Sequence, residues 1–148
     1  MQFFQQIDEG ESFPMTEWPL HITVADIFAI TVTDDLMADL EGYINFQPYT
    51  NSYIKDEGIL GVTPVWLLQN TLELQKTHDT LVGIVENHGA VFNTPAFTRS
   101  GFIPHITKQA HSNLKIGDKI SLSTTSLVDF FPGENWQQRK VIKCFGHK

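Results

Sequence analysis

The alternation of extended and helical segments is the feature that most constrains the fold. Two amphipathic helices are predicted, one starting after the N-cap Thr33 and one at a capping box formed by Asn70 and Glu73. Several extended segments follow one another directly and are joined by turns, which favours antiparallel pairing over a doubly wound parallel sheet. The sequence therefore predicts an α+β fold. Its strands are expected at 19–31 (with a break near Asp26), 52–58, 61–69, 102–108, 119–131 and 136–145.

Length and composition fit a single domain covering residues 1–148. The chain is 41% hydrophobic, and no Ser/Gly linker or charge block divides it. The apolar runs are far shorter than the ~20 residues that span a bilayer, and no basic-then-apolar leader is present at the N-terminus. Cys144 is the only cysteine, so no disulfide can form within the chain, and we expect it to be a small buried side chain. We therefore expect a monomeric, cytoplasmic protein without a membrane partner.

The charge balance restricts the possible partners. Ten Lys and Arg residues against 17 Asp and Glu residues give a net charge of −7. Binding to duplex DNA is driven by neutralisation of phosphates, so this balance argues against such a partner. A nucleotide or an RNA end needs only a local pocket and stays open as a ligand.

The tripeptide His-Ile-Thr occurs twice, at 21–23 and at 105–107, each time in an extended segment with a proline one or two residues earlier. Side chains alternate along a strand, so the histidine and threonine of each copy share one face while the isoleucine points to the other. Each copy thus presents an imidazole beside a hydroxyl. The predicted catalytic residues are His21, Thr23, His105 and Thr107.

These paired motifs resemble those of the two-histidine (2H) phosphoesterase superfamily, which includes LigT-like RNA 2',3'-cyclic phosphodiesterases and 2'-5' RNA ligases. The resemblance spans nearly the whole chain, one motif in each half. It implies a bilobal fold of two antiparallel sheets related by a pseudo-twofold axis, with outer helices and a central cleft. It also implies a phosphodiesterase in which His105 is the base and His21 the acid during ring opening.

The chemistry fits these residue types without a metal or other cofactor. Cleaving a phosphodiester requires one proton taken from the nucleophile and one given to the leaving oxygen, and histidine titrates near neutral pH. Threonine hydroxyls can donate to the non-bridging oxygens. No His, Asp and Glu spacing typical of a metal site occurs.

Residues near the motifs are candidates for substrate contacts. In the resembling family a basic residue follows the second motif at a short distance, whereas Lys108 follows Thr107 directly and is expected on the face opposite His105. Arg99, Arg139 and Lys143 are alternative cations. An aromatic ring could stack on a base or could simply pack in the core. The predicted substrate contacts are Trp18, Phe97, Arg99, Phe102 and Lys108.

Other readings of the chain remain open. A non-catalytic module that holds a nucleotide or RNA end on the same fold is the main alternative to an enzyme. His78 lies on the apolar stripe of the second helix and is predicted to be a packed histidine with satisfied hydrogen bonds. His111 and His147 are expected at the surface.

Overall fold

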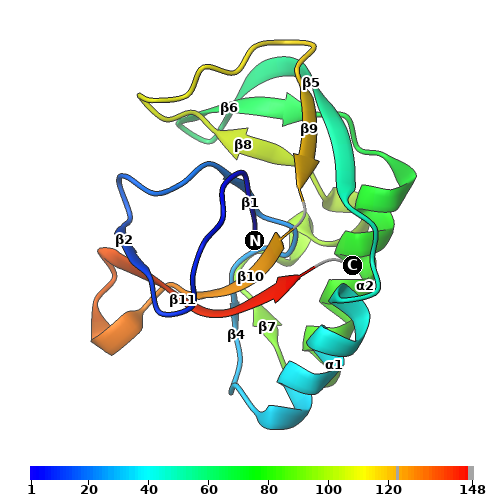
Figure 1. The fold of residues 1–148 in the computed structure, drawn as a ribbon, viewed down its shortest axis with the longest axis vertical. Helices are drawn as coiled ribbons and strands as arrows, with labels where there is room; N and C mark the ends of the chain where they lie inside the picture. The colour runs from blue at the N-terminus through cyan, green and yellow to red at the C-terminus, as the bar shows by residue number, and fades with distance from the viewer. Residues whose placement is uncertain (123, 147–148) are drawn as a thin grey trace.

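A computed structural model describes residues 1–122 and 124–146, and in this part of the chain two helices accompany three antiparallel sheets (Figure 1). This arrangement confirms the predicted α+β class. The pseudo-twofold relation between the sheets stays a prediction. His147 lies outside the described residues, whereas His111 is exposed as predicted.

The five-stranded sheet joins the first and last parts of the chain. Strand β1 pairs with β3 on one side and with β10 on the other, so N-terminal and C-terminal strands alternate within one sheet. Strands β1 and β2 come from an N-terminal segment that the sequence does not predict to be extended. The strand order is β2 (Ser12–Pro14), β11 (Gln138–Gly146), β10 (Thr124–Asp129), β1 (Gln2–Phe3) and β3 (His21–Ile22).

The four-stranded sheet is formed by the middle of the chain and lies above the five-stranded sheet in Figure 1. Its order is β8 (His105–Thr107), β6 (Thr63–Leu68), β5 (Thr50–Leu60) and β9 (Lys119–Leu122). Strands β4 (Phe28–Ala29) and β7 (Val91–Phe92) form a separate pair. Strand β6 lies between β8 and β5, and Pro64 is only its second residue, so the missing amide falls at the start of the strand.

Two predicted strands are divided in the structure. The segment 19–31 forms β3 and β4, with the residues between them outside any strand, which agrees with the expected break near Asp26. The segment 119–131 forms β9 and β10, which belong to different sheets. A continuous extended segment in the sequence therefore does not reveal where the chain changes its pairing strand. The periodicity indicates which face each side chain occupies, but not which strand lies alongside.

The helices begin close to the predicted residues. Helix α1 (Asp34–Ile44) has the predicted N-cap, since the Leu36 amide donates to Thr33 Oγ1 at 3.1 Å. Helix α2 (Leu72–Asn87) is capped by Thr71, whose Oγ1 accepts from the Leu74 amide at 3.2 Å. The predicted capping box is therefore wrong: the Asn70 side-chain amide donates to Gln75 Oε1 instead.

One main core connects both larger sheets to the helices. Helix α1 contacts α2 and β11, and α2 contacts β5. The central isoleucine of each His-Ile-Thr copy, Ile22 or Ile106, is fully buried in this core together with Leu36 and Leu74. Both motifs are thus anchored in the same apolar cluster. Among the described residues, no helix has the length and apolar character needed to cross a membrane.

Candidate active site

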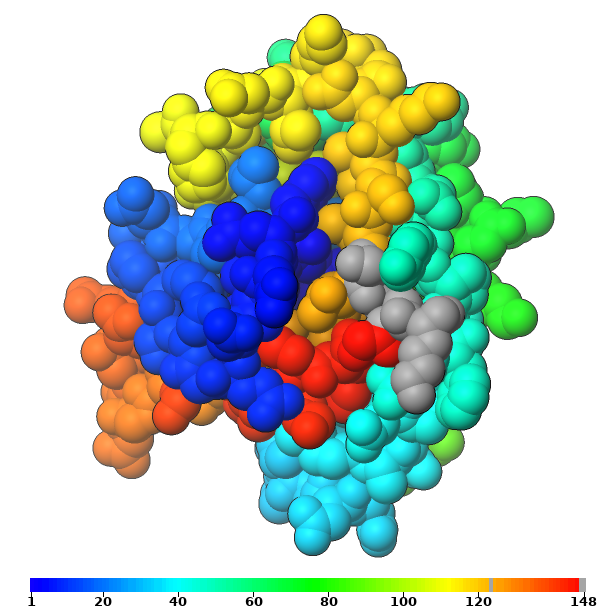
Figure 2. Space-filling model, in the orientation of Figure 1, coloured from blue at the N-terminus to red at the C-terminus, as the bar shows by residue number. Residues whose placement is uncertain are grey.

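The two His-Ile-Thr copies lie on adjoining edge strands. Strand β3 is the last strand of the five-stranded sheet, β8 is the last strand of the four-stranded sheet, and the two contact each other. Figure 2 shows the blue N-terminal segments next to the yellow segment that follows β8. The structure therefore brings together two motifs that are separated by 84 positions in the sequence (105 minus 21).

Both imidazoles are oriented by the same kind of hydrogen bond. His21 Nδ1 donates to the Pro19 carbonyl at 2.7 Å, and His105 Nδ1 donates to the Ile103 carbonyl at 2.8 Å. In each case the acceptor lies two residues before the histidine. Because a carbonyl can only accept, Nδ1 carries the hydrogen and Nε2 of a neutral ring carries the lone pair. In the described part of the chain neither Nε2 has a hydrogen-bond partner, so both can exchange protons with a ligand.

His21 is enclosed by aromatic rings and is only 7% exposed. Trp18 and Phe3 pack against its ring with centroid separations of 4.0 and 5.4 Å. Burial lowers the pKa of His21 to about 4, the Pro19 hydrogen bond opposes this effect, and positive charge on the N-terminus and on His105 lowers the pKa further. The imidazole of His21 is therefore neutral at pH 7.

The two threonines of the motifs are partly exposed. Thr107 is the last residue of β8 and shares the His105 face by strand alternation, whereas Thr23 follows directly after β3. Neither hydroxyl makes a side-chain hydrogen bond to any other described residue. Both hydroxyls are therefore available as neutral donors to an oxygen.

The predicted cations differ in what they contact. Arg99 forms an ion pair with Glu86. Lys108 Nζ lies 3.3 Å from Glu57 Oε2 and 4.1 Å from the centre of the Trp66 ring. Trp66 is paired with the central isoleucine of the second motif, so Lys108 lies on the face opposite His105, as the alternation predicts. The structure therefore does not bring Lys108 to the side of the sheet that carries His105.

Arg139 is the predicted cation that lies beside the first motif. Its Nη1 donates to the carbonyls of Phe130, Trp136 and Gln138, and no carboxylate pairs with it within the described residues. Its guanidinium carbon lies 5.8 Å from the centre of the Trp18 ring, which in turn covers His21. One aromatic ring thus separates an unneutralised cation from the candidate catalytic histidine.

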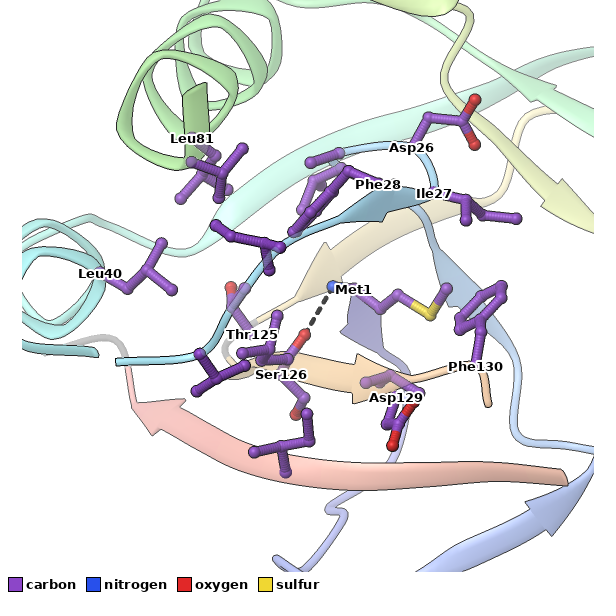
Figure 3. Close-up of a pocket in the computed structure, with 18 of the residues that line it drawn as sticks. Met1, Asp26, Ile27, Phe28, Leu40, Leu81, Thr125, Ser126, Asp129 and Phe130 are labelled. Carbon is purple, nitrogen blue, oxygen red and sulfur yellow. Dashed lines mark hydrogen bonds between the residues drawn. The ribbon is translucent and has the colours of Figure 1, made fainter. Parts of the chain in front are cut away.

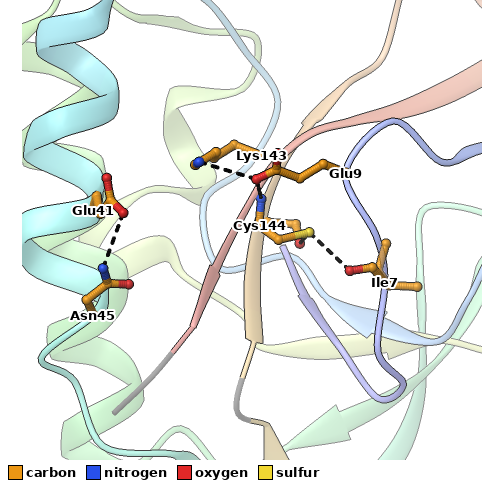
Figure 4. Close-up of polar contacts among 7 residues, drawn as sticks. Ile7, Glu9, Glu41, Asn45, Lys143 and Cys144 are labelled. Atoms are coloured by element: carbon orange, nitrogen blue, oxygen red, sulfur yellow. Dashed lines mark hydrogen bonds and ion pairs between the residues drawn. The ribbon is translucent and has the colours of Figure 1, made fainter.

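Lys143 lies on a different part of the surface. Its Nζ is 3.4 Å from Glu9 Oε1, and the same carboxylate oxygen accepts from the Cys144 amide (Figure 4). The Cys144 Sγ donates to the Ile7 carbonyl at 3.2 Å, and the side chain is only half-buried. Lys143 and Cys144 therefore hold the N-terminal segment against β11.

The predicted aromatic contacts also separate into different environments. Phe102 is buried and stacks on His78, with ring centroids 4.0 Å apart, so its ring belongs to the core. Trp18 is engaged with His21 but stays partly exposed. Phe97, in the short 3₁₀ helix η1 (Pro95–Phe97), is 48% exposed in the loop before the second motif. Phe97 is thus the predicted aromatic residue with the most accessible ring.

Three neighbours of the motif histidines are not identified from the sequence. They are Phe3 and the carbonyl groups of Pro19 and Ile103. Phe3 faces His21 because β1 pairs with β3, and this pairing leaves no local pattern in the sequence. A proline one or two residues before each histidine is the available signal for the Nδ1 hydrogen bonds, since it marks a rigid approach to each strand.

A separate apolar pocket of about 510 Å³ opens between the helices and β10 (Figure 3). Leu40 of α1, Leu81 of α2 and Phe130 line it, and the Met1 amino group donates to the Ser126 carbonyl at 2.7 Å. Burial lowers the pKa of this amino group to about 5. None of the four motif side chains lines this pocket.

Among the described residues, no three His, Cys, Asp or Glu side chains gather as a metal site would require.

Comparison with known proteins identifies a fold relative. No family model and no curated protein matches the sequence. A crystal structure of a phosphoesterase is similar over 87% of this chain and 77% of that chain, with 19% identity and a TM-score of 0.52. The apo form of LigT from E. coli aligns over 79% of this chain and 70% of that chain, with 17% identity and a TM-score of 0.48. The chain therefore has a fold similar to that of a solved phosphoesterase.

Proposed function

We propose that this protein is a metal-independent phosphodiesterase that acts on 2',3'-cyclic phosphate RNA ends or on cyclic or 2'-5' linked nucleotides. The observation that carries the proposal is the matched orientation of His21 and His105, whose Nδ1 atoms are both held by a carbonyl two residues earlier. Both Nε2 atoms are left for proton transfer on contacting strands. The likeness to a phosphoesterase agrees with this use of the fold.

The protonation state of His21 supports a specific division of roles. Because burial keeps its imidazole neutral at pH 7, His21 Nε2 is suited to take a proton from the attacking water. His105 then gives a proton to the leaving oxygen. This assignment is the reverse of the one implied by the family resemblance, and the aromatic enclosure of His21 is the reason for the change.

The proposed reaction balances without a further reactant. Water attacks phosphorus while its proton passes to His21 Nε2, the bond from phosphorus to the 2' or 3' oxygen breaks, and that oxygen receives the proton of His105. Thr23 and Thr107 donate to the non-bridging oxygens as their charge changes. His21 then releases a proton to solvent and His105 takes one up, which restores the starting state.

The test is turnover of a panel of 2',3'-cyclic mononucleotides, cyclic dinucleotides and 2'-5' linked dinucleotides. With a substrate that the native protein hydrolyses, His21→Ala and His105→Ala are each expected to lower kcat at least about a hundredfold, because each removes a positioned acid or base. His88→Ala is the matched control. His88 pairs with Asp39 at the far end of α2, so its loss should leave kcat unchanged.

The result also separates the enzyme from the binding module. Saturable binding of these nucleotides without turnover would support the module. Turnover that persists in either single histidine variant would refute the proposed mechanism, provided that circular dichroism shows both variants to be folded.

A further inference from the structure

We propose that His78 is a positioning residue that fixes the two His-Ile-Thr motifs relative to each other. The proposal rests on the proposed function, since it assigns His78 a role in that same site. His78 lies on α2, is fully buried and touches neither motif histidine in any described contact. It instead bonds to the segment that follows the first motif and to the segment that leads into the second.

The first bond reaches the N-terminal motif. His78 Nδ1 donates to the Val24 carbonyl at 2.8 Å, and Val24 is the residue directly after Thr23. The hydrogen must reside on Nδ1, because the carbonyl can only accept. Strand β3 ends at Ile22, so this bond holds the chain where the strand no longer supports it.

The second bond reaches the C-terminal motif. His78 Nε2 accepts from the Arg99 amide at 2.8 Å, at the start of the 3₁₀ helix η2 (Arg99–Gly101). Phe102, the next residue, stacks on the His78 ring with an angle of 3° between the planes. Ile103 follows, and its carbonyl is the acceptor that orients His105. The four peptide units between Arg99 and Ile103 therefore connect His78 to the carbonyl that orients His105.

The turn at Arg99 depends on this support. Arg99 has φ of 55°, a left-handed conformation that non-glycine residues adopt at a cost. Its carbonyl is also held, because Gln75 Nε2 donates to it at 2.9 Å from the preceding turn of α2. Gly101 in the same turn leaves no space for a side chain, since an added Cβ would lie 1.7 Å from the Ala96 carbonyl oxygen. A tight, strained turn thus takes its position from one face of α2.

Histidine suits this role better than other residues. A neutral imidazole offers a donor and an acceptor on different edges of one rigid ring, which can therefore bridge two segments of chain. Both nitrogens of His78 are used, and burial lowers the pKa of its imidazole, so the neutral form is retained. A second proton at Nε2 would face the Arg99 N–H and break the link to the second motif.

Three substitutions separate the two links. His78→Phe keeps an aromatic ring against Phe102 and loses both hydrogen bonds. In His78→Asn the amide lies nearest the Nδ1 position and can still donate to Val24, whereas in His78→Gln the longer side chain reaches the Nε2 position and can still accept from Arg99. His88→Asn is the control, because it removes a histidine hydrogen bond at the C-cap of α2, away from both motifs.

The first measurement uses nuclear magnetic resonance and needs no substrate. We expect His78→Asn to shift the ring signals of His105 more than those of the first motif. His78→Gln should shift the amide signals of Thr23 and Val24 more than the His105 ring. Unchanged signals at both motifs in a folded variant would overturn the proposal.

The second measurement is steady-state kinetics with 2',3'-cyclic adenosine monophosphate. We expect His78→Phe to lower kcat at least about tenfold while KM changes less than about threefold, because misplacement of reacting groups by 1 Å or less has effects of this order. His78→Asn and His78→Gln each keep one hydrogen bond and should therefore retain a higher kcat than His78→Phe. A wild-type kcat in folded His78→Phe would overturn the proposal, and if that variant does not fold, the Asn and Gln variants decide the result in the same way. If the wild-type protein hydrolyses no member of the substrate panel, the proposed function fails while the resonance shifts still test His78.

Discussion

Lowering the pH until His21 becomes protonated tests directly whether the surrounding aromatic rings keep this side chain neutral. Burial lowers the pKa of His21 to about 4 in the folded chain, whereas an unfolded chain should titrate near the ordinary value of about 6.5. Between these values the unfolded chain binds the proton more readily. Stability contributed by the neutral ring is therefore present above pH 6.5 and is lost as the pH falls through this range.

The magnitude follows from the two pKa values. The difference between about 6.5 and about 4, at about 1.4 kcal/mol for each pH unit, amounts to about 3.5 kcal/mol for complete protonation. Most of this amount, about 3 kcal/mol, is lost between pH 7 and pH 4. The loss is a substantial part of the stability of a small domain, which is typically about 5–15 kcal/mol.

Urea denaturation from pH 7 to pH 4 measures this loss, with His21→Asn as the reference protein. The Asn side chain can still donate to the Pro19 carbonyl but does not titrate, so the difference between the proteins isolates His21 from the other acid-sensitive groups. The free energy of unfolding of the wild-type protein should fall about 3 kcal/mol further than that of the variant. Parallel curves, together with a His21 ring signal that titrates above pH 6, would refute the reasoning.

Three further predictions follow from the site and the core. Hydrolysis is expected to survive exhaustive EDTA treatment, because imidazoles and hydroxyls supply the proton transfer and charge stabilisation; loss of activity restored by one divalent ion would contradict this. Trp18→Leu should admit water to His21, raise its pKa toward 6.5 and move the acid limb of the kcat/KM profile to higher pH, and an unmoved limb would exclude His21 as the base. Leu74→Ala should lower the free energy of unfolding by about 2–5 kcal/mol in urea, whereas the exposed Leu72→Ala on the same helix should change it by less than about 0.5 kcal/mol.

The elements that local chemistry determines could be predicted from the sequence. Thr33 caps α1 because a hydroxyl one residue before a helix satisfies a free amide, and this relation is contained in a few neighbouring residues. His78 could be predicted as a packed histidine because it lies on the apolar stripe of α2, and its two hydrogen bonds confirm this. The α+β class followed in the same way from the change of period along the chain.

The features that depend on distant pairing could not be predicted. The change from β9 to β10 transfers the chain between sheets within one extended segment that contains no Gly or Pro to mark it. Strand β1 has only two residues, so no periodicity marks it, yet it places Phe3 against His21. That Thr71 and not Asn70 is the N-cap could not be predicted either, because either residue type can cap a helix; in the structure the Asn70 amide instead donates to Gln75.

The position of β1 has a consequence for the order in which the protein can assemble during synthesis. Strand β3, which carries His21, is attached to its sheet through β1, and β1 in turn pairs with β10 near the other end of the chain. On the ribosome β1 and β3 can pair with each other early, but this pair must wait for the rest of its sheet until residues 124–129 have emerged. Contacts over such a sequence separation favour slow folding. A nascent chain stalled before β10 should consequently show the second motif paired in its sheet, through β8 and β6, while β1 and β3 still lack the rest of theirs.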